Sequence, residues 1–114
     1  MFRPTVAFGL LLCLAMPAAA LERRVYEGDE AKALKCVWII SRTAAVMEDM
    51  GIISPLQMEV SIAISARILA LHVSGTEAQK LAALQAVGER RNTGETIVEF
   101  RDQAMACLRK FPVE

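Results

Sequence analysis

Two helix-start signals in the middle of the chain limit what it can fold into. In each, a hydroxyl residue is followed three positions later by glutamine, which is the pattern of a capping box. The two pairs are Ser54 with Gln57 and Thr76 with Gln79. Pro55 strengthens the first signal, because proline is favoured at the first position of a helix. The signals predict helices at about residues 55–73 and 77–91.

Two further helices are predicted from apolar residues that recur at steps of three and four, which is helical periodicity. The recurring residues of the first segment, 29–50, are Ala33, Val37, Ile40, Ala44 and Met47. Those of the last segment, 94–110, are Ile97, Phe100, Ala104 and Leu108. No segment of useful length alternates polar and apolar residues as a strand does. The chain is therefore predicted to be all-α, with four helices.

The cysteines give independent evidence on how the helices are arranged. Short connections favour antiparallel neighbours and hence a small up-down-up-down four-helix bundle. Cys36 lies early in the first helix and Cys107 late in the last, so that antiparallel packing places both at one end. A disulfide requires Cα atoms within about 7 Å, which this topology permits. We therefore expect one structural disulfide, Cys36–Cys107, to close the bundle.

The helix at 55–73 carries two features of its own. It is apolar nearly all round, which is typical of a central helix, and its three alanines on one side let another helix approach closely: Ala63, Ala66 and Ala70. A polar stripe follows another side and consists of Gln57, Ser61, Ser65 and His72. The stripe is either a wet seam whose hydroxyls bond back to helix carbonyls, which is common, or a polar groove for a ligand.

The N-terminus has the layout of a secretory signal peptide. A basic start ending at Arg3 precedes a short apolar run and the small residues 18–20, so we expect cleavage after Ala20. The mature domain is then residues 21–114, located in the periplasm or secreted. We expect no membrane insertion after cleavage, because the best remaining candidate, residues 58–73, is too short and contains charged residues.

The charge balance and the residue inventory argue against several function classes. The whole chain has 13 basic and 13 acidic residues, so no basic excess points to nucleic acid. His72 is the only histidine, and Ser65 lies roughly 10 Å along the same helix, which is too far for a nucleophile and its base. No metal-ligand spacing or cofactor motif is present in the sequence. We therefore expect neither an enzyme nor a bound metal or cofactor.

Two surface features are candidate interaction residues. Glu48 and Asp49 lie in the last turn of the first helix, where the helix dipole disfavours negative charge. They either pair with Arg90 and Arg91 across the bundle or form an acidic site for a partner or a cation. Trp38 lies off the densest apolar stripe of its helix, and either packs in the core or anchors an interface.

Taken together, these observations favour an exported, non-catalytic binding or interaction module, such as an inhibitor, an immunity-type partner or an accessory subunit. An unknown protein partner is expected. The alternative is a cofactor- or metal-binding bundle that uses His72 and Met105, because imidazole and thioether groups suit copper or haem. A third reading is a periplasmic stress chaperone. The sequence leaves the partner and the oligomeric state open.

Overall fold

The computed structural model describes residues 24–114, and the predicted signal peptide, residues 1–20, lies outside this part. The described residues form four helices and no strand: α2 Gly28–Asp49, α3 Pro55–His72, α4 Glu77–Glu89 and α5 Thr93–Lys110. These bounds differ by at most two residues from those predicted. The expected all-α four-helix bundle closed by one disulfide is confirmed.

The helix starts form as the capping signals predict. The Ser54 hydroxyl accepts a hydrogen bond of 3.1 Å from the Gln57 backbone N–H, and the Gln57 side chain accepts one of 2.8 Å from the Ser54 N–H. Thr76 and Gln79 repeat this reciprocal pair at the start of α4. Each capping box satisfies two backbone donors that a helix N-terminus leaves without intrahelical partners.

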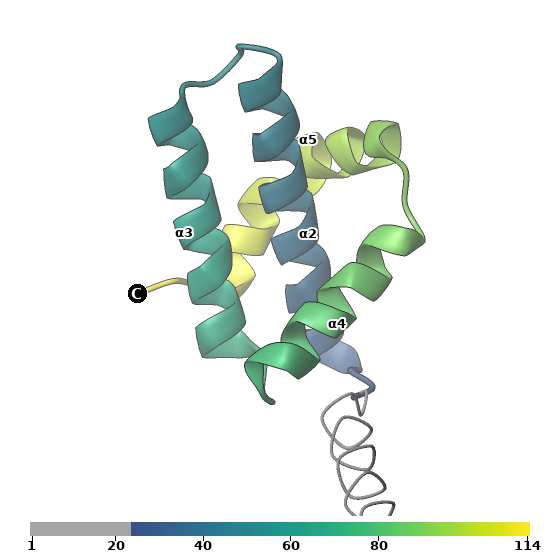
Figure 1. The fold of residues 1–114 in the computed structure, drawn as a ribbon. Coiled ribbons are helices and arrows are strands. Elements are labelled where there is room, and N and C mark those ends of the chain that lie inside the picture. Colours follow the sequence, from purple (N-terminus) through teal and green to yellow (C-terminus); the bar gives the residue numbers. More distant parts are fainter. Residues whose placement is uncertain (1–23) are drawn as a thin grey trace, which may run out of the picture.

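The central helix of the bundle is α2, which packs against each of the other three helices (Figure 1). Four of the five recurring residues predicted for its inner side are buried, namely Ala33, Val37, Ile40 and Ala44, whereas Met47 near the end of the helix is half-buried. Its neighbour α3 runs antiparallel to it and contributes Ile68 and Leu69 to the same core.

The prediction that the helix at residues 55–73 is central is wrong. After α3 the chain bends by 117° into α4, so α4 crosses α2 instead of covering the far side of α3. Gly75 makes this turn with φ +103°, where a Cβ would also lie 2.6 Å from the Tyr26 hydroxyl oxygen. As a result α3 packs in the bundle on one side and is exposed on the other.

The disulfide joins Cys36 in α2 to Cys107 in α5, with the two Cα atoms 5.8 Å apart. Both cysteines are buried, and Phe111 packs into the same core. The expected inner side of α5 is only partly confirmed, because Ile97 and Leu108 are exposed. The buried residues of this helix are instead Thr96 and Cys107, since the disulfide turns that side of α5 towards α2.

None of the helices in residues 24–114 is by itself long and apolar enough to cross a membrane. Taken together, the bent pair of α3 and α4 is long and apolar enough for a membrane span, by length and composition only.

Candidate functional site

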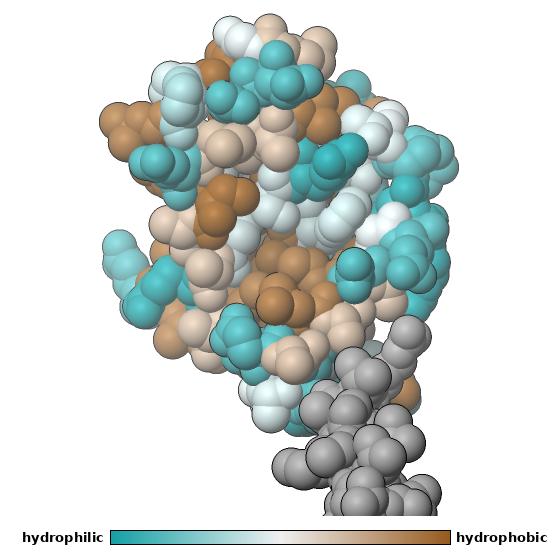
Figure 2. All heavy atoms as spheres, viewed as in Figure 1, coloured by the Kyte–Doolittle hydropathy of each residue, from teal (hydrophilic) through white to brown (hydrophobic). Residues whose placement is uncertain are grey.

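The side of α3 that faces away from α2 is the most unusual surface of the described residues. Helical spacing places seven residues on it, and we call them the outer face of α3: Leu56, Glu59, Val60, Ala63, Ala66, Arg67 and Ala70. All seven are exposed, and the exposed fraction of the residue is 68% for Leu56 and 52% for Val60. In Figure 1, α3 lies at one edge of the molecule, and in Figure 2 brown apolar side chains reach the surface along that edge.

The outer face contains two charges of opposite sign. Glu59 and Arg67 form no ion pair with any of residues 24–114. Arg67 donates from Nε and Nη2 to the Val113 carbonyl, at 3.3 and 3.1 Å, which holds its guanidinium against the C-terminal segment. The face therefore combines apolar surface with one acidic and one basic group.

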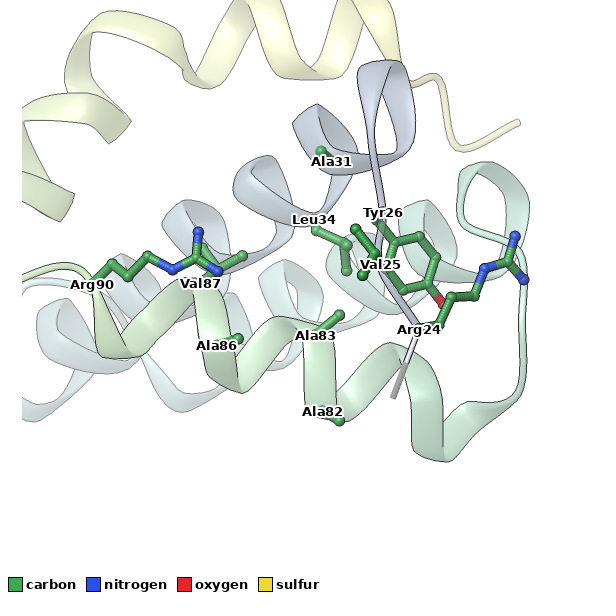
Figure 3. A pocket seen from close by; sticks show the side chains of 10 residues that line it. All are labelled: Arg24, Val25, Tyr26, Ala31, Leu34, Ala82, Ala83, Ala86, Val87 and Arg90. Atoms are coloured by element: carbon green, nitrogen blue, oxygen red, sulfur yellow. The ribbon is translucent and has the colours of Figure 1, made fainter. Parts of the chain in front are cut away.

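A small cleft lies between α4 and the segment that precedes α2 (Figure 3). Its volume is about 280 Å³, and its lining includes Leu34, Ala83 and Val87. Arg24 and Arg90 lie at opposite ends of it. This volume is slightly below the range of about 300–1,000 Å³ that is typical of ligand pockets. The rest of the cleft's lining is mostly apolar.

The end of the cleft at Arg24 is engaged within the chain. The Arg24 guanidinium lies 5.1 Å from the centre of the Tyr26 ring and 4.0 Å from a Glu30 oxygen. Glu30 also accepts hydrogen bonds of 2.6 Å from the Ser74 hydroxyl and the Ser74 N–H. These hydrogen bonds, with smaller effects from Arg24 and Lys80, hold the pKa of Glu30 below its ordinary value. Glu30 is thereby a structural anchor for the turn between α3 and α4.

Of the two readings of Glu48 and Asp49, the pairing with Arg90 and Arg91 is wrong, and the binding role stays a prediction. Arg91 pairs with Glu99 in α5, and no ion pair of Glu48 or Asp49 occurs in residues 24–114. The physical reason is the bend before α4. It places the end of that helix beside the middle of α2, at Trp38 and Arg42, and not beside its C-terminus.

Glu99 lies at the centre of an ion triad. Lys35 lies 2.9 Å from one of its oxygens, and Arg91 pairs with the other. Burial raises the pKa of Glu99, but the hydrogen bonds and charges of Lys35 and Arg91 outweigh it, so the pKa lies below the ordinary value. Glu99 of α5 thereby links α2 to the segment between α4 and α5.

Trp38, the other candidate interaction residue, is half-buried and engaged within the chain. Its ring covers Gly88 of α4 so closely that a Cβ there would lie 2.5 Å from the nearest ring atom. Its Nε1 donates to the Thr96 hydroxyl at 3.4 Å. The residue therefore connects α2 to α4 and α5.

The histidine of the alternative prediction has an internal partner. His72 Nε2 donates to the Pro112 carbonyl at 2.8 Å, and its ring meets Phe111 edge-on at 5.4 Å between centroids. Met105, the other residue of that prediction, lies on α5 with 65% of its surface exposed. Among residues 24–114 no three His, Cys, Asp or Glu side chains are grouped to hold a metal ion.

The polar stripe of α3 behaves as a seam at one of its two serines. The Ser61 hydroxyl donates to the Gln57 carbonyl at 3.1 Å, as a helix hydroxyl commonly does. The Ser65 hydroxyl is buried and, like that of Thr43, has no hydrogen-bond partner in the described part of the chain. The stripe therefore faces the interior at Ser65 and does not line an open groove there.

Sequence reasoning assigned the outer face of α3 to the core. The signal that could have identified it was present, because a helix that is apolar all round needs neighbours on both sides.

In comparisons with protein-family models, curated proteins and solved structures, the chain matches none of them significantly.

Proposed function

We propose that this chain is an exported, non-catalytic interaction module that binds a protein partner through the outer face of α3. The observation that carries the proposal is that α3 is apolar on both sides, whereas the other helices of residues 24–114 cover only one. Surface helices of single globular domains normally have a polar outer side. An exposed, contiguous apolar surface is typical of a protein interface.

The chemistry of the other surfaces supports the same proposal. Outside the outer face, three residues with suitable chemistry are used within the chain: Trp38 packs on Gly88, His72 bonds to Pro112, and Glu99 belongs to an ion triad. Glu48 and Asp49 form no ion pair with residues 24–114 and stay candidate interaction residues. An inhibitor, an immunity-type partner or an accessory subunit would each need a docking surface and no catalytic group. The cofactor-binding and stress-chaperone alternatives stay predictions.

Export is part of the proposal and has its own test. The buried disulfide is a form of cross-link that persists in oxidising compartments such as the periplasm. The intact mass of protein recovered from its native host is expected to correspond to a chain that begins at Leu21. A mass that still includes residues 1–20 would contradict export by a cleaved signal.

The interaction is tested by a photo-crosslinking residue placed at Leu56 in the living host. Met105 is the matched control, because it is exposed to nearly the same extent, 65% against 68%, on a different helix. We expect a discrete covalent adduct from position 56 and none from position 105. Equal adducts from both positions, or none from position 56, would contradict the proposal.

A further inference from the structure

The outer face of α3 has a pattern of charge and size that is symmetric about one residue. Glu59 lies four positions before Ala63, and Arg67 lies four positions after it. Leu56 lies seven positions before Ala63, and the small Ala70 lies seven positions after it. Each acidic or large side chain on one half of the face thus has a basic or small counterpart at the same distance on the other half.

We infer that the outer face of α3 binds the same face of a second copy of this chain, antiparallel, about a twofold axis at Ala63. This inference rests on the proposed function and names the partner. A twofold axis brings together residues that are equidistant from it on opposite sides. Glu59 then lies at the level of the partner's Arg67, and Leu56 at the level of the partner's Ala70.

The contacts of this arrangement are complementary. Glu59 and Arg67 are unpaired within residues 24–114, and the twofold axis supplies each with an opposite charge, twice per dimer. Arg67 commits Nε and Nη2 to Val113, which leaves Nη1 to face a carboxylate. Alanine at positions 63, 66 and 70 leaves room for Leu56 of the other copy and lets the helices approach to about 8 Å.

A parallel pairing of the same faces is disfavoured. It would place Glu59 beside the partner's Glu59 and Arg67 beside the partner's Arg67, and like charges brought together at an interface oppose association. An unrelated protein partner could cover the apolar residues, but the mirrored positions of Glu59 and Arg67 would then serve no purpose. The charge pattern therefore selects a second copy in antiparallel orientation.

The test is sedimentation equilibrium of the oxidised protein with single charge reversals. The wild type is expected to be a dimer that dissociates on dilution. Glu59→Arg alone and Arg67→Glu alone should each raise the dissociation constant by roughly 10- to 100-fold, because each places two like-charged pairs in the interface. The double variant should dimerise again. An equimolar mixture of the two single variants should also associate, as a heterodimer with both pairs attractive.

The outcomes separate the inference from its alternatives. In a parallel dimer the single reversals would exchange one like-charged pair for another, so they would not weaken association. A protein that stays monomeric at every concentration, or a dimer indifferent to the reversals, overturns the inference. Circular dichroism checks that each variant is folded, and Glu59→Arg is the cleaner change because Glu59 has no partner in residues 24–114.

A second measurement tests the position of the axis. Ala63→Cys should form an intermolecular disulfide on mild oxidation, whereas Ala78→Cys, which is also exposed but lies on α4, should not. If the protein is monomeric and the crosslinker at Leu56 still captures a different exported protein, the proposed function stands and this inference fails. If position 56 captures nothing and the protein is monomeric, both fail.

Discussion

At the scale of single residues, the most consequential groups are carboxylates that bond across helices. Glu30 accepts two hydrogen bonds from Ser74, and Glu99 joins Lys35 of α2 to Arg91 beside α4. Neither role is visible in the sequence, because Ser74 is 44 residues from Glu30, and Lys35 belongs to another helix than Glu99. Sequence periodicity indicates which side of a helix faces the core, but it does not indicate which charged side chains of different helices form ion pairs.

The carboxylate of Glu99 makes stability depend on pH. Its pKa is below the ordinary value of 4.5 in the folded protein, so its contribution is fully present above that value. The contribution is lost as the pH falls through the lower, folded-state pKa, because the unfolded chain binds the proton more readily. Thermal melts between neutral pH and pH 3 should therefore lose stability less steeply in Glu99→Gln than in the wild type.

The matched control for this experiment is Glu89→Gln. Glu89 is exposed to solvent at the end of α4, whereas Glu99 is half-buried, and Glu89 forms no ion pair with residues 24–114. Identical acid profiles for Glu99→Gln and the wild type would show that the triad contributes nothing to folding.

At the scale of elements, the helix bounds could be predicted from the sequence and the packing of the helices only in part. Capping boxes and glycines act within a few residues, so α3 and α4 begin where Ser54 and Thr76 indicate. The inner side of α2 also follows from its periodicity. What could not be predicted is the direction of α4, which depends on the turn at Gly75 and on Trp38 covering Gly88.

The contact between Trp38 and Gly88 gives a prediction about α4. Gly88→Ala would place a methyl group against the Trp38 ring, and overpacking of this kind costs about 1–3 kcal/mol. Alanine returns up to about 1 kcal/mol in helix propensity, so we expect a net loss of about 1–2 kcal/mol. The measurement is the free energy of unfolding in urea, compared between Gly88→Ala and the wild type. Gly94→Ala is the control, since its Cβ meets only Asn92 at 3.4 Å, and it should be neutral or stabilising. Equal stability of the two variants would contradict the contact.

At the scale of the whole molecule, one covalent link closes most of the fold. The disulfide spans a sequence separation of 71 residues and encloses α3, α4 and most of α2 and α5. The sequence predicted this link, because only two of the three cysteines lie in the predicted mature domain, residues 21–114, and two cysteines leave a single connectivity. It did not predict that the far side of α3 is exposed in the described part of the chain. The apolar residues that pack against a chain's own helices look the same in a sequence as those that bind another molecule.

Reducing the disulfide should lower the free energy of unfolding by about 2–5 kcal/mol, typical for a small secreted domain. The measurement compares urea unfolding of the oxidised protein with that of the Cys36→Ser/Cys107→Ser variant. Alkylation of both thiols in the native, oxidised protein would show instead that the link is absent. Equal stability of the two forms would mean that the core alone holds the bundle.

The disulfide also divides the described chain into a covalent ring, residues 36–107, and two tails that leave it. Both tails form hydrogen bonds with the C-terminal part of α3 and the residues that follow it. Tyr26 and Glu30 of the first tail bond to Ser74, while Pro112 and Val113 of the second accept hydrogen bonds from His72 and Arg67. The disulfide ring thus links α3 covalently to α2 and α5, and the hydrogen bonds of the two tails fix the orientation of α3. A protease that removed the C-terminal residues after Phe111 would leave the ring intact and free the Arg67 side chain from Val113. The α3 surface could therefore be altered without unfolding the protein.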